Sequence, residues 1–142
     1  MIRKVQERAQ QIISGFKSPA DDYLEGRLDI TSTLVIDPHC TFYFRMSTDC
    51  MSTFNIPENA ILIVDRSLKA IDGAVIIAPY HGELICRVYK KSNLRTQLVS
   101  DDETISFKDG NTLEIWGVVI AVCYGVLPKG LKKGRYSNVC IM

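Results

Sequence analysis

The chain has 142 residues, of which 46% are hydrophobic and 23% are charged, and its formal net charge is +1. This profile is typical of one globular domain with a real core, and it excludes a chain that is disordered throughout. Because the charge is nearly balanced, the whole chain gives no electrostatic reason for nucleic-acid binding, and we expect no direct sequence-specific contact with DNA.

The longest apolar run, WGVVIAVCYGVL at 116–127, ends at Pro128. It is shorter than the roughly 20 residues that a membrane-spanning helix needs, so we predict a buried strand and no membrane association. The polar start MIRKVQERAQQ has no apolar segment after its positive charges. This pattern predicts no secretory signal and a cytoplasmic protein.

The five cysteines are odd in number and widely spaced, which is typical of reduced thiols rather than of a disulfide framework. They are Cys40, Cys50, Cys86, Cys123 and Cys140. No CxxC pair indicates zinc. We therefore predict no metal site, and nothing in the sequence requires a cofactor.

In chain order, residues 2–13 carry apolar side chains at loosely helical spacing, but the segment is too short to be a stable lone helix. We expect a mobile arm over 1–14. After Gly15 and Pro19, the stretch DDYLEGRLDITSTLV at 21–35 is expected to form a short helical turn that leads into the domain.

From residue 41 onward, short segments rich in β-branched and aromatic residues alternate with turn signals such as IDG, YHG and KDG. These segments are TFYFRM, AILIVD, GAVIIA, ELICRVYK, RTQLVS, TISF and TLEIWGVVIAVCYG. They predict a mainly β domain over 15–127, followed by a flexible basic tail over 128–142.

In ELICRVYK, strand alternation puts Leu84, Cys86 and Val88 on one face and Ile85, Arg87 and Tyr89 on the other. We therefore expect Cys86 in the core and Arg87 pointing elsewhere.

The aromatic residues of the β region are expected in the core, with contact to a second subunit along an edge strand as the alternative. They are Phe42, Tyr43, Phe44 and Trp116. Met51 is expected to pack in the interior and Asp49 to serve in a turn.

Two basic clusters are expected to be solvated surface, with contact of the tail to DNA as the alternative. Their members are Lys90, Lys91, Lys129, Lys132, Lys133 and Arg135.

Four stretches resemble, in the same order, segments of the UmuD/LexA family of self-cleaving Ser-Lys peptidases. They are GFKSPADDYLEGRLDI at 15–30, FRMSTDCM at 44–51, ILIVDRSL at 61–68 and LEIWGVVIAV at 113–122. The first is similar to the UmuD segment GFPSPAADY, with Lys17 where the family usually has Pro. The resemblance covers roughly residues 15 to 125, and it implies a twisted β-sheet or half-barrel like the C-terminal domain of that family.

The resemblance also implies where the catalytic dyad lies. In the family, the serine of a GDSM box attacks a peptide bond, and a lysine at the end of GEFTVK removes its proton. These positions are occupied here by Cys50 and Arg87, and Thr48 stands where the family has glycine. Their separation, 87 minus 50, is 37 residues, which is the family's own spacing.

Arg87 is a poor substitute for the lysine. A lysine can act as the base because burial can lower its pKa until a neutral amine is present. A guanidinium stays charged and has no acceptor, so it neither removes nor returns a proton. Its charge can still favour a Cys50 thiolate, so a cysteine peptidase remains the alternative to an inactive site. His39 and His81 fall at no dyad position.

By the same resemblance, the family cuts just before the glycine of GFPSP, and the equivalent bond here joins Ser14 and Gly15. The 14 residues before it are too few for the helix-turn-helix domain of LexA, so we expect no repressor.

The resemblance implies an SOS-response protein that forms a homodimer and serves a UmuC-like Y-family translesion DNA polymerase as an accessory or regulatory subunit. A peptidase that cleaves itself through Cys50 is the alternative. A RecA filament and an active UmuD relative are the other partners that the resemblance suggests.

Overall fold

The computed structural model of the chain describes residues 12–13, 16–17, 29–108 and 113–131. The chain divides into two compact units, Met1–Leu34 and Val35–Met142. In the first unit, β1 (Ile12–Ile13) pairs antiparallel with β2 (Phe16–Lys17). Ile12 and Ile13 are therefore extended, although the spacing of 2–13 was loosely helical, because β-branched residues suit a paired strand. The rest of the expected arm lies outside the described residues.

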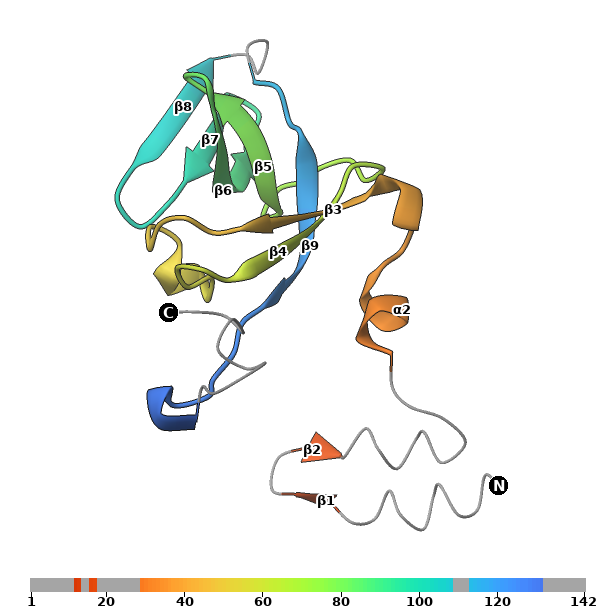
Figure 1. Cartoon of the computed structure of the whole chain (residues 1–142). Helices are drawn as coiled ribbons and strands as arrows, with labels where there is room; N and C mark the ends of the chain where they lie inside the picture. Colours follow the sequence, from red (N-terminus) through yellow and green to blue (C-terminus); the bar gives the residue numbers. More distant parts are fainter. Residues whose placement is uncertain (1–11, 14–15, 18–28, 109–112, 132–142) are drawn as a thin grey trace. The chain divides into compact units, whose positions relative to one another are not determined.

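The short helix α2 (Ile30–Leu34) follows in the same unit (Figure 1). Asp29 stands just before it, and its carboxylate accepts a hydrogen bond from the Thr31 backbone N–H at 3.0 Å, as an N-cap residue does. The helical turn expected within 21–35 is thus confirmed at residues 30–34.

The second unit is built on one seven-stranded antiparallel sheet in the order β3-β4-β9-β5-β6-β7-β8. The strands are β3 (Thr41–Arg45), β4 (Ile61–Asp65), β5 (Val75–Tyr80), β6 (Glu83–Lys91), β7 (Arg95–Val99), β8 (Thr104–Lys108) and β9 (Gly117–Cys123). Short 3-10 turns occur at Pro38–Cys40, Ser52–Phe54 and Lys129–Leu131. Each of the seven strand segments predicted from the sequence overlaps one of these strands, and the mainly β fold is confirmed.

The last strand of the sheet in sequence lies near its middle. β9 pairs with β4 on one side and with β5 on the other. In Figure 1, β3 and β4 run across the lower part of this unit, β5 to β8 rise above them, and β9 passes along both groups. No helix within the described residues is long and apolar enough to cross a membrane.

Two hydrophobic clusters form the core, and β6 contributes to both. Cys86 and Val88 belong to the first cluster, whereas Tyr89 is a buried member of the second, against which Ile85 packs. This division follows the alternation predicted for ELICRVYK, and the burial of Cys86 is confirmed. Leu84 departs from the pattern and is exposed, because it lies next to the turn at the start of the strand.

The aromatic residues of β3 are less buried than the sequence suggested. Phe42 is 40% exposed and Tyr43 is 57% exposed, so the expectation that they belong to the core was wrong. The reason is that β3 is an edge strand with a neighbour on one side only. Phe44 and Trp116 are partly buried against the first cluster, with their ring centroids 5.1 Å apart.

Candidate active site

A cleft of about 430 Å³ lies where the loop after β3 meets the first half of β6. Its walls are formed by residues 44–50, by residues 83–87, and by Leu62, Ile77 and Asp102. Both residues that the resemblance led us to expect at the dyad positions, Cys50 and Arg87, are in these walls.

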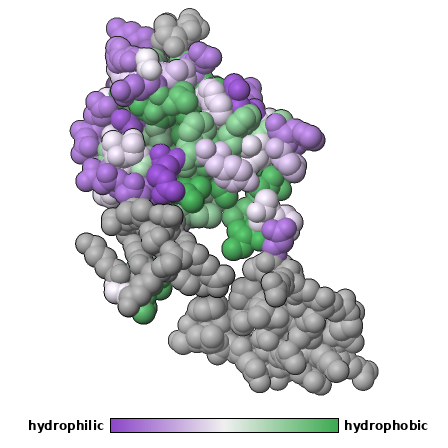
Figure 2. Space-filling model, viewed as in Figure 1, coloured by the Kyte–Doolittle hydropathy of each residue, from purple (hydrophilic) through white to green (hydrophobic). Residues whose placement is uncertain are grey.

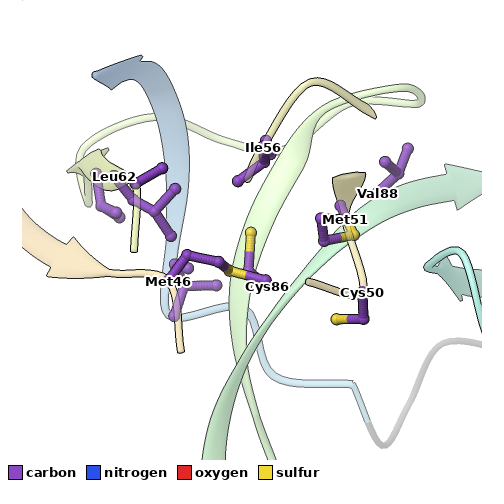
Figure 3. Packing of buried hydrophobic residues seen from close by; sticks show 10 residues of the cluster. Met46, Cys50, Met51, Ile56, Leu62, Cys86 and Val88 are labelled. Atoms are coloured by element: carbon purple, nitrogen blue, oxygen red, sulfur yellow. The ribbon is translucent and has the colours of Figure 1, made fainter. Parts of the chain in front are cut away.

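Cys50 is held in place by its neighbours in the loop. Met51 is 0% exposed and anchors the loop in the first core cluster, where Cys50 itself is 9% exposed. Figure 3 shows both side chains among the buried residues of this cluster, close to Cys86. The Asp49 carbonyl accepts hydrogen bonds from the Ser52 N–H at 3.1 Å and from the Ser52 hydroxyl at 2.7 Å. Asp49 and Met51 thus lie as their turn and packing interpretations predicted.

The turn between β7 and β8 holds the same loop from another direction. The Asp101 N–H donates to the Cys50 carbonyl at 2.8 Å. The Asp101 carboxylate accepts from the Thr53 N–H at 3.1 Å and also from the Thr53 hydroxyl. These contacts hold the backbone at Cys50 and three residues after it, so they help to set the position of the sulfur.

Arg87 enters the cleft at a point where β6 is paired on one side only. Arg87 lies opposite Ile76 of β5, whereas pairing with β7 begins one residue later, at Val88. The side chain is only 13% exposed. It turns back to donate from Nη1 to the Cys86 carbonyl at 2.8 Å, and Nη2 lies 3.5 Å from Glu103 Oε1.

The same nitrogen reaches the cysteine. Arg87 Nη1 donates to Cys50 Sγ at 3.3 Å, and Thr48 Oγ1 lies 3.1 Å from Sγ. Within the described part of the chain these two groups are the polar neighbours of the sulfur. Both groups can donate a hydrogen bond, so the sulfur is placed to accept from a cation and from a hydroxyl.

Among the described residues, no base or acid other than this guanidinium is in hydrogen-bond contact with the sulfur. His39 lies in the turn Pro38–Cys40 and His81 in the turn between β5 and β6, and neither lines the cleft. Glu103 carries a carboxylate, but it contacts Nη2 of Arg87. The nitrogen that binds the sulfur is the other one, Nη1. The guanidinium is therefore the only ionisable group in hydrogen-bond contact with Sγ among the described residues.

Cys86 plays a different part from Cys50. Burial raises the pKa of the Cys86 thiol to about 12, and the nearby positive charge of Arg87 only partly opposes this. Cys86 is thus a neutral packing residue at ordinary pH.

The bond expected to be the equivalent of the scissile bond joins residues 14 and 15. Ser14 and Gly15 lie outside the described residues, between β1 and β2 in the first unit. In the described ranges, no group of three or more His, Cys, Asp or Glu side chains could hold a metal ion.

Sequence reasoning missed three contributors to the site. They are Asp101, Glu103 and the hydroxyl of Thr48. The acidic run DDE at 101–103 was the available signal, but it is typical of an ordinary polar turn until the sheet brings it beside Arg87.

Residues 7–120 match the Peptidase S24-like family. The chain is similar to the protein MucA of Salmonella typhimurium, at 32% identity over 113 residues that cover 78% of this chain and 77% of MucA. It is 32% identical to the protein ImpA of the same species, over 82% of this chain and 81% of ImpA. The protein SamA of Salmonella typhimurium strain LT2 is 29% identical over 76% of both chains.

Proposed function

Since the chain belongs to the Peptidase S24-like family, we propose that it is a UmuD-like SOS-response protein whose dyad positions no longer cleave a peptide bond. It acts instead as a homodimeric accessory or regulatory subunit of a UmuC-like error-prone translesion DNA polymerase. The observation that carries the loss of cleavage is the 3.3 Å contact between Arg87 Nη1 and Cys50 Sγ.

Peptide-bond cleavage by a cysteine needs a thiolate and then a proton for the departing amine. Arg87 can supply the first requirement by its charge. It does not supply the second, because a guanidinium holds its protons too strongly to deliver one to a leaving group. The Thr48 hydroxyl is not an acid at neutral pH, and Glu103 contacts Nη2 of the guanidinium, whereas Nη1 contacts the sulfur.

The pairing of two copies has support from the edge of the sheet. Among the strands that the structure describes, β3 has a partner on one side only, and its Phe42 and Tyr43 side chains are exposed. An exposed edge strand with aromatic side chains is suited to contact with another subunit. Sedimentation equilibrium would give twice the mass of 16.0 kDa for the purified protein, and a single-chain mass at micromolar concentration would contradict the dimer.

The alternative function is self-cleavage at the bond between Ser14 and Gly15. The observation in its favour is that both polar neighbours of Cys50 Sγ can stabilise a thiolate. Intact mass spectrometry after incubation at alkaline pH, with and without a RecA filament, separates the two functions. We expect the mass to remain unchanged. Loss of the first 14 residues in the wild type, but not after Cys50→Ala, would establish the peptidase instead.

The polymerase partnership needs its own test. Co-expression with a UmuC-like polymerase should allow the two proteins to be purified together through an affinity tag on either one. The variant Cys50→Ala should bind equally well if the cleft has no part in the partnership. Failure of the wild type to bind the polymerase would remove this element of the proposal, whatever the result of the cleavage assay.

A further inference from the structure

One face of the β6–β7–β8 end of the sheet carries cations that the proposed function does not use. Strand register places Lys90 opposite Gln97, and Gln97 opposite Ser106. One step further out on the same face, Arg95 is opposite Lys108. We call Lys90, Arg95 and Lys108 the basic face. On the same face of β6, the residues before Lys90 are Val88 and Cys86, which are buried in the first core cluster.

The three cations are exposed and have no ion-pair partner among the described residues. The nearest acidic segment, the turn after β7, is engaged elsewhere: Asp101 binds Thr53, and Glu103 pairs with Arg87. Arg95 and Lys108 are like charges in directly opposite positions, which is an unfavourable pairing in a sheet. The arrangement therefore has no evident benefit for folding, and an anionic partner would relieve the repulsion.

Sheet geometry gives the size of this surface. Neighbouring strands lie about 4.8 Å apart, so the face is about 10 Å wide from β6 to β8. Lys90 and Arg95 are diagonal neighbours, roughly 7–8 Å apart at Cα. Figure 2, in the view of Figure 1, shows hydrophilic side chains along the side of this unit that ends in β8. The charges are thus spread over a surface rather than gathered in a pocket for one small ion.

The side chains between the cations indicate which polyanion fits. Gln97 and Ser106 are polar, and Gln97 Nε2 donates to Ser106 Oγ at 3.4 Å. None of the described positions on the basic face is aromatic, whereas proteins that hold single strands usually stack bases on aromatic rings. An acidic peptide would also be expected to use an apolar anchor, which these positions do not offer. Phosphates at regular spacing need only the cations and the amide.

We infer that the basic face binds the phosphate backbone of duplex DNA without regard to sequence. This inference goes beyond the proposed function, since it involves neither the cleft nor the polymerase, and it holds whether or not Cys50 is reactive. The near-neutral net charge of +1 is compatible with it, because the cations are gathered on one face. It is also consistent with the expectation of no sequence-specific contact, because the cations would read charge and not base edges.

The test uses two variants of the full chain with the same net charge. Lys90→Gln with Lys108→Gln removes two cations of the basic face. Lys69→Gln with Lys91→Gln removes two exposed cations elsewhere, and Lys91 is the neighbour of Lys90 on the opposite side of the same strand. Both should keep the wild-type circular dichroism spectrum, and neither should unfold at a lower temperature than the wild type. Binding is measured by fluorescence anisotropy with a labelled duplex of unrelated sequence at about 50 to 200 mM salt.

For three phosphate contacts, the logarithm of the wild-type affinity should fall against the logarithm of salt concentration with a slope of about −3. This is a loss of about 40-fold between the two salt concentrations. The basic-face variant should bind at least about ten-fold more weakly at low salt and show a slope of about −1. The control variant should stay within about three-fold of the wild type.

Three outcomes would overturn the inference. The first is no wild-type binding at low salt, and the second is an equal loss in both variants. The third is a single strand of the same length, or polyglutamate, binding more than about ten-fold tighter than the duplex, since this would indicate a different partner.

Discussion

Replacing Arg87 by lysine should restore self-cleavage, because it returns a proton-transferring group to the position of the guanidinium. Arg87 Nη1 lies 3.3 Å from Cys50 Sγ, and the side chain is only 13% exposed. A shorter amine in this enclosed place loses hydration, which lowers its pKa towards the range in which it can exchange protons. General acid–base catalysis contributes about 10²–10⁴ in rate, equivalent to about 3–5 kcal/mol of the barrier.

We therefore expect Arg87→Lys to cleave the bond between Ser14 and Gly15 about 10²–10⁴ times faster than the wild type. The assay is intact mass spectrometry over time at a series of pH values. The base is the neutral amine, so the rate should rise with pH until it reaches the pKa of the amine and then level off. Adding Cys50→Ala to this variant should abolish the cleavage, which shows that the sulfur is the nucleophile.

Arg87→Gln is the matched control, because it removes the charge without supplying a base. The reasoning is refuted if a folded Arg87→Lys protein cleaves no faster than Arg87→Gln. It is equally refuted if the wild type already cleaves at the rate of Arg87→Lys, since the guanidinium would then not be the obstacle. Thermal unfolding of each variant establishes that the compared proteins are folded.

Three other outcomes test separate parts of the structure. Lys108→Glu should raise the free energy of unfolding in urea by about 0.2–1 kcal/mol, because it turns the like-charge pair with Arg95 into an attractive one. A lower free energy of unfolding would contradict the register of β7 and β8. Met51→Ala should lower the free energy of unfolding by about 2–5 kcal/mol in the same assay, because the Met51 side chain is 0% exposed. A loss below about 1 kcal/mol would contradict its place in the core. In a Cys50→Ala background, the ultraviolet thiolate absorbance of Cys86, taken as the difference from the variant that also carries Cys86→Ala, should stay close to zero up to about pH 10, because burial raises its pKa to about 12. A thiolate signal that rises and levels off between about pH 8 and 10 would contradict the raised pKa.

The strands could be predicted from the sequence because their signal is local. Segments such as AILIVD and ELICRVYK combine β-branched residues with period-two alternation, and turn residues separate them. The two burial faces of β6 followed from that alternation alone, and they agree with the two core clusters. Local patterns were sufficient wherever the answer depended on a residue and its near neighbours.

The order of strands in the sheet is not a local property, and this is where the sequence reasoning failed. Phe42 and Tyr43 were expected in the core because aromatic residues usually are, but their exposure depends on β3 being at the edge. Similarly, Asp101 and Glu103 reach the candidate site only because the β7–β8 turn packs beside the loop of Cys50. The positions of Cys50 and Arg87 came from the family resemblance and not from any local pattern.

The place of β9 bears on how this protein folds as it is synthesised. The strands β3 and β4 on one side, and β5 to β8 on the other, are joined through β9, which is the last of them to leave the ribosome. Pairings such as Ile61 with Cys123 close a long loop, and contacts so distant in sequence slow folding. Until Gly117–Cys123 emerges, the nascent chain carries two half-sheets with open inner edges at β4 and β5. This interval is when a chaperone would protect the chain most effectively from aggregation.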